Sequence, residues 1–341
     1  MKHSESIIST DHLKSEADLD FALDLEDSAE QYEERTFICD ASLHGVRLDN
    51  ALVNLVDEFS RSYLQQLIER GAAIVNGLVV LKPSTKVKAG DKLKITLYAT
   101  PQSQAFKPEV VDFEVVFEDE YLLVINKPAG LVVHPAPGNW TGTLLNGLLH
   151  RFPSSQLLPR AGIVHRLDKD TSGLMVVART RLVMDALVKK IADRDVHRQY
   201  LALAHHKWAS AKQLDVSQPI GRDPRNRLRM AVVSLDKQAG KTAKTSFELL
   251  QNCEQGCLIK CRLHTGRTHQ IRVHMSFLGH PLVSDAVYGG VAAAGLKRQG
   301  LHAERLEFEH PVTGESMKFV APTPPDLVNA FAFWGLRYNE L

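Results

Sequence analysis

Eleven consecutive residues, VHRLDKDTSGL at positions 164–174, concentrate charge in a way that could do chemistry. Asp168 stands between Arg166 and Lys169, and nearby positive charge keeps a carboxylate ionised. An ionised carboxylate held in place can act as a nucleophile, a base or an electrostatic anchor. The alternative is a solvated turn, because Asp-Thr-Ser-Gly is typical of turns without a function. On its own, the stretch slightly favours the turn.

Two further segments have the same polar, glycine-punctuated character. KPAGLVVHPAPGNWTGTLLN occupies residues 127–146, and LHTGRTHQIRVHM occupies residues 263–275, with Arg267, His269 and Arg272 among them. Loops of this kind commonly present functional side chains from a rigid scaffold. No metal-binding or nucleotide-binding motif accompanies them. The three segments together predict a cofactor-free site for a large anionic substrate. In this company, residues 164–174 are better explained as a functional loop than as a plain turn.

The elements that must position these segments are mostly strands. Stretches rich in Val, Ile, Leu, Phe and Tyr predict strands at residues 113–119, 121–127, 174–180, 200–206, 245–251, 257–265 and 316–322. Apolar residues at helical spacing predict helices at 181–194 and 268–279. Strands and helices do not alternate regularly, so we expect an α+β domain over residues 113–341, built on a mixed, largely antiparallel sheet.

A smaller unit precedes this domain at residues 37–99. Leucines at helical spacing predict two helices, the second behind a Ser60 N-cap. An Asn-Gly pair at 76–77 predicts a tight hairpin ahead of a last short strand. We therefore expect two helices packed on a short sheet. Residues 100–112, which contain Pro, Gln and Ser, are predicted to be a linker.

The charge of the chain is strongly asymmetric. Residues 1–36 hold eleven acidic and three basic residues, and the rest holds 38 basic and 29 acidic residues, although the net charge of the whole is only +1. We expect the acidic segment to be a disordered tail. The basic remainder favours an anionic partner, with nucleic acid first, over a charge that only serves solubility.

Cysteine usage and hydropathy indicate a soluble cytoplasmic protein without a membrane partner. The N-terminus is acidic, and no apolar run approaches the 18 or so residues that a membrane helix needs. Four cysteines are few for 341 residues. The spacing of Cys253, Cys257 and Cys261 matches no zinc pattern, and the last two alternate with apolar residues as on one face of a strand. No metal site is predicted.

The small unit resembles the S4 RNA-binding domain. The matching pattern is Arg47-Leu48-Asp49, Ser60-Arg61, Gly71 to Gly77, and Lys82 to Asp91. In that family a helical face with arginines lies on RNA phosphates. The resemblance implies that Arg61, Arg70 and Lys82 contact phosphates rather than bases. Binding by such a face weakens steeply as salt rises. The alternative is a solvated basic face on a small folding unit.

The larger domain resembles the RluA family of pseudouridine synthases, in particular those that act on the large ribosomal subunit. The motifs are His165-Arg166-Leu167-Asp168 with Thr171-Ser172-Gly173, Arg198-Gln199-Tyr200-Leu201-Ala202, and GRTHQIRVH at 266–274. The resemblance covers Arg47 to about Pro325. It implies an isomerase that converts uridine to pseudouridine without a cofactor, acting on large-subunit ribosomal RNA or a pre-ribosomal particle. We expect a monomer.

The resemblance also implies a role for individual residues. Asp168 would be the essential catalytic residue, acting either by covalent attack or by assisting glycal formation. Tyr200 would stack on the uracil as general base or relay, and Arg272 would orient Asp168 and keep it ionised. Arg166 would occupy the gap left by the flipped nucleotide. The other RNA-binding residues implied in this domain are His165, Arg267 and His269.

The chain departs from the family pattern at one position, and two alternative functions also have to be considered. Ser284-Asp285 replaces the usual Gly-Asp of the family, and we expect a changed turn but an unchanged reaction. A non-catalytic RNA-binding or ribosome-assembly factor could share the fold, but the three catalytic positions are intact. A glycosidase with Asp168 and Asp170 as paired carboxylates is disfavoured, because close positions in one loop seldom place two carboxyl groups on opposite sides of a bond.

Overall fold

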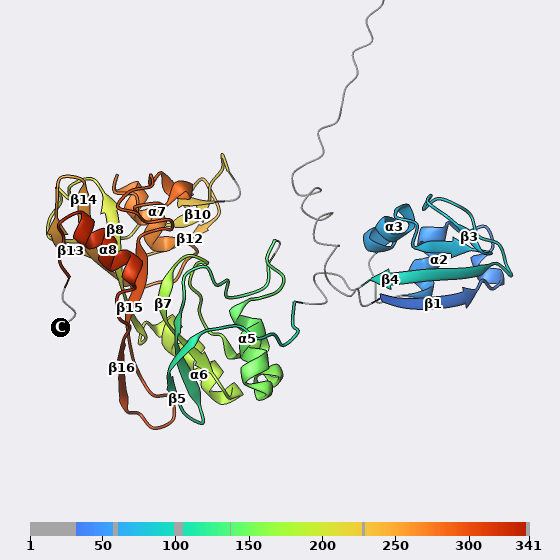
Figure 1. The fold of residues 1–341 in the computed structure, drawn as a ribbon, viewed down its shortest axis with the longest axis horizontal. Coiled ribbons are helices and arrows are strands. Elements are labelled where there is room, and N and C mark those ends of the chain that lie inside the picture. Colours follow the sequence, from blue (N-terminus) through green and yellow to red (C-terminus); the bar gives the residue numbers. More distant parts are fainter. Residues whose placement is uncertain (1–31, 57–60, 99–104, 137, 227–228, 339–341) are drawn as a thin grey trace, which may run out of the picture. The chain divides into compact units, whose positions relative to one another are not determined.

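The computed structural model describes residues 32–56, 61–98, 105–136, 138–226 and 229–338. These fall into two compact units, the first ending at Ser103 and the second beginning at Gln104 (Figure 1). Each unit has a hydrophobic core of its own. The division agrees with the two folded domains predicted from the sequence.

The first unit is a four-stranded antiparallel sheet with two helices. The strands lie in the order β1-β4-β2-β3, with bounds β1 Tyr32–Ile38, β2 Ala73–Val75, β3 Leu78–Val79 and β4 Lys92–Tyr98. The helices are α2 (Leu48–Leu55) and α3 (Arg61–Glu69), preceded by a short 3-10 turn, η1 (Ala41–Leu43). Their leucines pack with the strands in one core. Asn76 and Gly77 are both left-handed, with φ of 50° and 85°, as a two-residue hairpin requires.

Strand β1 corrects the predicted boundary of the acidic tail. Residues 32–36 were assigned to that tail, yet they pair with β4, where Arg35 faces Ile95. Glu34 forms an ion pair with Lys94 of β4 at 2.8 Å. The acidic composition concealed the strand, because charged side chains are acceptable on an exposed strand whose backbone is paired. The remainder of the predicted tail, residues 1–31, lies outside the described residues.

The second unit is built on a nine-stranded sheet. Strands follow the order β5-β6-β7-β15-β8-β14-β13-β9, with β16 paired to β15. Their bounds are β5 Glu114–Glu118, β6 Leu122–Lys127, β7 Ser172–Ala178, β8 His197–His205, β9 Gln213–Val216, β13 Thr245–Asn252, β14 Gly256–Leu263, β15 Leu301–Glu309 and β16 Ser316–Val320. The β7–β15 pair is parallel and the other neighbours are antiparallel. The mixed, largely antiparallel sheet is confirmed.

Helices and a second small sheet complete this unit. The helices are α5 (Leu144–Arg151), α6 (Arg181–Asp193), α7 (Gln270–Phe277) and α8 (Pro325–Phe333), with 3-10 turns η2 (Pro153–Leu157), η3 (Pro159–Gly162) and η4 (Ala286–Tyr288). The small sheet has the order β11-β10-β12, with bounds β10 Ile220–Arg222, β11 Met230–Val232 and β12 Gly240–Lys241. All seven predicted strands and both predicted helices are present. Elements without a sequence prediction are α5, α8, β9 to β12 and β15.

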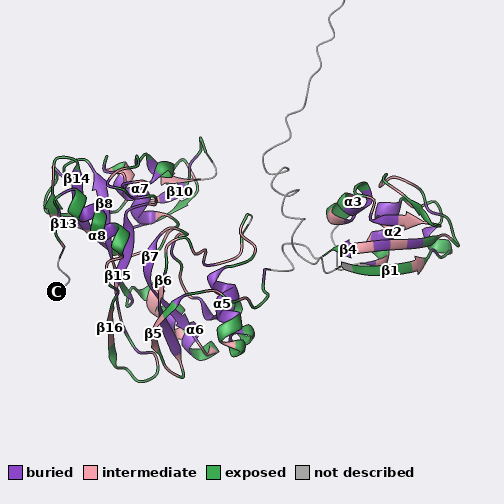
Figure 2. Ribbon diagram, viewed as in Figure 1, coloured by how far each residue is buried: buried purple, intermediate pink, exposed green. Residues whose placement is uncertain are grey.

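Different helices cover different parts of the large sheet, and each contributes to its own cluster of buried hydrophobic side chains (Figure 2). Residues of α5 and α7 share the main core with β6, β7, β8, β14 and β15. Residues of α6 pack with other side chains of β6 and β7, and α8 packs on Leu203 and Leu258. Cys257 and Cys261 are fully buried in the main core, which confirms the predicted strand face.

The predicted linker is shorter than residues 100–112. Ala105 is buried, and the side-chain amide of Asn146 in α5 donates to the carbonyl oxygens of Ala105 (3.2 Å) and Lys107 (2.8 Å). Val111 packs against the main core. Residues 105–112 therefore belong to the second unit, because an amide from α5 satisfies their backbone. In the described part of the chain, no helix combines the length and the apolar character needed to cross a membrane.

Candidate active site

Asp168 lies in a short loop that leads into β7. The backbone N–H of Thr171 donates to the carbonyl of Asp168 at 3.1 Å, which closes a tight turn. The carbonyl of Lys169 accepts from the backbone of Gly130 and from Nζ of Lys127, both at 2.9 Å. Lys127 is fully buried, and its Nζ also donates to two carbonyls of its own turn. Sequence reasoning missed this lysine, although it begins the predicted segment at 127–146.

Residues 298–303 hold the other side of the same loop. Four side-chain hydrogen bonds join the two segments. Arg298 donates to the carbonyl of Asp170 (3.0 Å) and to the hydroxyl of Ser172 (3.3 Å), Gln299 donates to Thr171 (3.2 Å), and His302 shares one with Ser172 (2.9 Å). Gly173 then pairs with Ala303 of β15 at a φ of +115°. A Cβ at Gly173 would lie 2.1 Å from the carbonyl oxygen of Ala303, so this approach requires glycine.

Arg272 joins two carboxylates. Its Nη1 donates to Oδ2 of Asp168 at 2.9 Å, while Nε and Nη2 donate to the two oxygens of Asp285 at 2.7 and 2.8 Å. Arg272 and Asp285 are buried, and the Asp168 side chain keeps 17% of its surface exposed. Burial alone would lower the pKa of Arg272, but hydrogen bonds and charge from both aspartates raise it above its ordinary value. Asp168 is therefore an oriented carboxylate with a permanent cation beside it.

Asp285 and Tyr288 are site residues that sequence reasoning missed. The Tyr288 ring lies under the Arg272 guanidinium, 4.9 Å from its centroid, and the Tyr288 hydroxyl shares a 2.7 Å hydrogen bond with Nδ1 of His269. The other nitrogen of His269 lies 3.8 Å from Asp168. Both residues follow Ser284, the position at which the chain departs from the usual Gly-Asp of the family. Ser284 is left-handed with φ of 61°, a conformation that glycine adopts more easily.

Tyr200 is buried on β8, paired with Cys261 of β14. Burial raises the pKa of its hydroxyl to about 12, while the charge of nearby Arg198 lowers it and that of Asp168 raises it. The phenol is therefore protonated at neutral pH. In this state its ring can stack on a nucleobase. To act as a general base, the hydroxyl must first lose its own proton.

Two family models match the chain. The model for RNA pseudouridylate synthase matches residues 121–277, which include Asp168, Tyr200 and Arg272, and the S4 domain model matches residues 46–93. Ribosomal large subunit pseudouridine synthase D of Neisseria meningitidis serogroup B is 47% identical over 297 residues, covering 84% of this chain and 78% of that protein. The chain belongs to the RNA pseudouridylate synthase family.

A second relative and a solved structure also resemble this synthase. The protein of the same name from Xanthomonas campestris pv. campestris is 46% identical, covering 84% of this chain and 88% of that protein. The solved structure of human RNA pseudouridylate synthase domain containing 1 is 28% identical, with a TM-score of 0.52, and covers 66% of this chain and 89% of that chain. The synthase is thus an isomerase of RNA uridine, with an N-terminal S4 domain.

The structure does not support the RNA contact predicted for His165. Its Nε2 accepts from the backbone N–H of Val176 in β7 at 3.1 Å, and its Nδ1 is buried without a hydrogen-bond partner among the described residues. Burial, together with the charge of Arg198, lowers the pKa of the ring to about 3. His165 is therefore a neutral residue of the synthase that holds the Asp168 loop on β7. Arg166, its neighbour, is exposed as its predicted role requires.

We expect acidification to destabilise the second unit through His165. Its pKa is depressed on folding, so its contribution to stability is complete above the unfolded value of 6.5 and is lost as the pH falls towards 3. Between pH 7.5 and 5.5 the free energy of unfolding should fall by about 1.4 kcal/mol from this residue. Urea titration followed by tryptophan fluorescence measures it, because all three tryptophans lie in the second unit.

His165→Gln is the matched variant, since its amide oxygen can accept from Val176 but does not titrate. The pH dependence of the free energy of unfolding should shrink by the same amount. An identical pH dependence in the variant and the wild-type synthase would contradict the assignment.

The remaining predicted residues of the third segment have separate partners. Nε of Arg267 donates to the carbonyl of Thr242 at 3.1 Å, and the side chain is partly exposed. His264 and His274 share hydrogen bonds with different hydroxyls, those of Ser246 and Thr245. The histidines of this segment thus serve different contacts. Among them, His269 approaches Asp168.

In the S4 domain, a buried carboxylate that sequence reasoning missed organises the arginines. Asp49 is fully buried and accepts from Arg47 (3.0 Å) and Arg61 (2.9 Å). Hydrogen bonds from Arg47, then Gln65 and Arg61, hold the pKa of Asp49 well below its ordinary range. Arg61 therefore has an internal partner, although half of its side chain is exposed. The other two predicted phosphate contacts, Arg70 and Lys82, are exposed.

Proposed function

We propose that this synthase isomerises uridines of large-subunit ribosomal RNA, with Asp168 as catalyst and the S4 domain as a second RNA contact. The observation that carries the proposal is the chain Asp168–Arg272–Asp285, which orients one partly exposed carboxylate beside a cation. The choice of RNA is supported by the printed names of the relatives and by the basic charge of the chain beyond residue 36. We propose the cytoplasm and a pre-ribosomal particle as its setting.

The reaction replaces one carbon–nitrogen bond by a carbon–carbon bond. The bond between N1 of uracil and C1′ of ribose breaks, the base turns, C5 bonds to C1′, and the proton of C5 passes to solvent while N1 gains one. Asp168 starts this reaction by attack on C1′ or by assisting glycal formation. Both routes need an oriented carboxylate, and Nη1 of Arg272 donates to Asp168 at 2.9 Å. No atom is gained or lost, so the route requires no redox partner.

The neighbours of Asp168 serve the extruded nucleotide. Tyr200 presents a neutral aromatic ring, suited to stacking on uracil close to C5. Arg166 is exposed next to the catalytic loop, where it can fill the space that the flipped uridine leaves in its helix. Exposed Arg70 and Lys82 of the S4 domain supply salt-dependent contacts with RNA phosphates.

Tritium release tests the proposed substrate. The full-length synthase is incubated with large-subunit ribosomal RNA tritiated at uridine C5, beside small-subunit and transfer RNA labelled in the same way. We expect release from the large-subunit transcript at least about tenfold faster than from the others. Faster release from a small-subunit or transfer RNA would reassign the substrate, and no release from any of the three would contradict the catalytic assignment.

A further inference from the structure

The second carboxyl oxygen of Asp168 faces a histidine. Nη1 of Arg272 donates to Oδ2 of Asp168 at 2.9 Å, and Nε2 of His269 lies 3.8 Å from Oδ1. A separation of 3.8 Å is too long for a hydrogen bond, but contacts of this kind commonly shorten when substrate fills a site. What His269 can do for Asp168 therefore depends on which of its two ring nitrogens carries a proton.

The hydroxyl of Tyr288 determines the tautomer of His269. Its oxygen accepts from the backbone N–H of Met230 in β11 at 3.1 Å and shares a 2.7 Å hydrogen bond with Nδ1 of His269. Within the described part of the chain, these are the two hydrogen bonds of that hydroxyl. Because a backbone N–H can only donate, the phenolic proton goes to Nδ1. A neutral imidazole that accepts at Nδ1 carries its own proton on Nε2, so an N–H points at Oδ1 of Asp168.

Packing holds both rings in this arrangement. Tyr288 is 7% exposed and shares a hydrophobic cluster with Val273 of α7. The rings of His269 and Tyr288 meet edge to face, with centroids 5.6 Å apart. His269 stands immediately before α7, and its carbonyl accepts from the backbone N–H of Val273 at 2.9 Å. The imidazole is thus fixed by α7 through its backbone and by Tyr288 through its ring.

The charges around His269 act on its pKa in opposite directions. Burial lowers that pKa below the ordinary value of 6.5, the two nearby aspartates raise it, and the two nearby arginines lower it. In order of effect, these groups from the loop before β7, from α7 and from the residue before η4 are Asp168, Arg272, Asp285 and Arg166. The hydrogen bond from the Tyr288 hydroxyl also favours the neutral ring, since an imidazolium has no acceptor. His269 is therefore neutral at neutral pH.

We propose that His269 is a positioning residue for the reaction, and that its Nε2–H holds Oδ1 of Asp168 while Arg272 holds Oδ2. With a donor on each oxygen, the carboxyl group cannot turn about its Cβ–Cγ bond. A neutral donor suits this task, because an imidazolium would form an ion pair with Asp168 and weaken it as a nucleophile or base. The proposal rests on the proposed function, since it assigns the chemical step to Asp168. It takes the place of the RNA contact predicted for His269.

Two substitutions of His269 separate its ring nitrogens. His269→Asn places an amide where Nδ1 stands, is too short to reach Asp168, and accepts the left-handed backbone at φ of 56°. His269→Gln places an amide N–H near the position of Nε2. At saturating large-subunit RNA, single-turnover tritium release by His269→Asn should be about ten- to a hundredfold slower, the range for one hydrogen bond to a charged group. His269→Gln should recover a substantial part of the rate, and RNA affinity should stay within a factor of about two in both variants.

The pH dependence of the same rate tests the tautomer. In the wild type the rate should fall as the pH drops through the pKa of His269, which lies below 6.5, and this step should be absent from both His269 variants. Tyr288→Phe keeps the ring under Arg272 but removes the hydroxyl that favours the neutral imidazole. Loss of that hydrogen bond raises the pKa of His269, so the step should move to higher pH in Tyr288→Phe.

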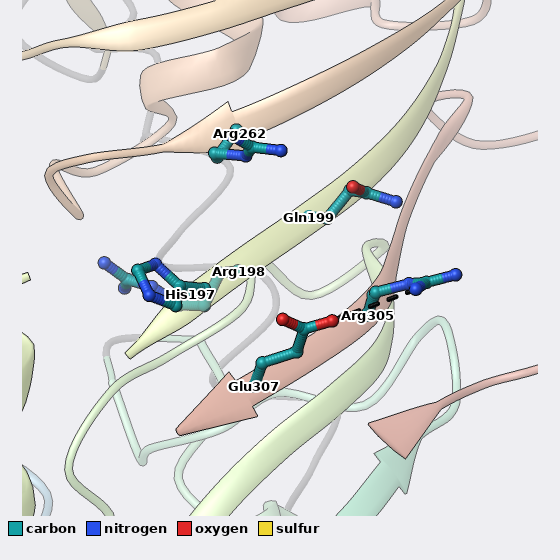
Figure 3. Close-up of a pocket in the computed structure, with 6 residues that line it drawn as sticks. All are labelled: His197, Arg198, Gln199, Arg262, Arg305 and Glu307. Carbon is teal, nitrogen blue, oxygen red and sulfur yellow. Dashed lines mark ion pairs between the residues drawn. The ribbon is translucent and has the colours of Figure 1, made fainter. Parts of the chain in front are cut away.

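His197→Gln is the matched control. His197 is exposed at the start of β8, where it lines a polar pocket of about 310 Å³ (Figure 3). Successive residues of a strand point to opposite faces, so His197 and Tyr200 lie on opposite faces of β8. The substitution removes a histidine on the face of the sheet away from Tyr200. It should leave the rate, the RNA affinity and the pH step unchanged.

The outcomes distinguish this proposal from the proposed function. If His269→Asn weakens RNA binding but keeps the wild-type rate at saturation, or if the pH step stays in place in Tyr288→Phe, the positioning role is wrong. Long-range proton–nitrogen NMR of the full-length protein reports the tautomer without RNA, with His269 assigned by its absence in His269→Gln. A proton on Nδ1 would overturn the proposal whatever the activity, whereas a wild type that releases no tritium from any transcript would overturn the proposed function.

Discussion

Asp168→Asn should abolish tritium release, lowering kcat by at least about a thousandfold, while the affinity for RNA stays within a factor of about two. The asparagine keeps the shape of the side chain and can still accept from Nη1 of Arg272. It cannot attack C1′ or remove a proton, because the charge is gone. A loss confined to kcat therefore identifies Asp168 with the chemical step. The measurement is single-turnover tritium release beside a direct binding titration.

Asp170→Asn provides the control, since it changes the same atoms two residues away in the same loop. The structure uses the backbone carbonyl of Asp170, which accepts from Arg298, and this bond survives the substitution. We expect Asp170→Asn to keep most of the activity. Comparable release by Asp168→Asn and the wild type would remove Asp168 as catalyst, and equal loss in the two variants would indicate damage to the loop rather than to the chemistry.

Arg272→Met should destabilise the second unit by about 3–5 kcal/mol, the usual cost of removing one partner from a buried ion pair. The substitution preserves much of the side-chain volume. It leaves Asp285 buried without its cation, and it also removes the cation that holds Asp168. Urea unfolding followed by tryptophan fluorescence reports this unit alone, because the S4 domain contains no tryptophan.

The double variant Arg272→Met, Asp285→Asn distinguishes an ion-pair effect from a packing effect. If the unpaired carboxylate of Asp285 causes the loss of stability, neutralising Asp285 should restore a substantial part of the free energy of unfolding. It should restore none of the activity. A double variant that is less stable than Arg272→Met would show that packing, not charge, is responsible. Wild-type stability in Arg272→Met itself would contradict the buried pair.

The sequence was most informative where chemistry is local. Asp168, Tyr200 and Arg272 sit in motifs that can be identified within a few residues. Asp49 and Asp285 were missed because their sequence neighbours do not distinguish a buried carboxylate from an exposed one. Their burial is visible only once distant segments have packed around them.

The elements without a prediction also have identifiable reasons. Strands β10 to β12 are two or three residues long, too short for an alternating pattern to register. Helix α5 contains Gly147 and follows a loop rich in glycine and proline, both unfavourable signs for a helix. Strand β1 is concealed by its acidic residues. His165 was misassigned because its neighbours are RNA-binding candidates, whereas its own ring is bonded to β7.

The contacts between residues 298–303 and the Asp168 loop have a consequence for synthesis on the ribosome. Ser172 and His302, which meet in the folded protein, are 130 positions apart, so the loop emerges long before the strand that fixes it. Contacts of such long range form late in folding. The S4 domain, whose core is complete by Leu97, can fold and meet RNA while translation continues. A nascent chain that has not yet reached Ala303 should therefore bind RNA and leave every uridine unchanged.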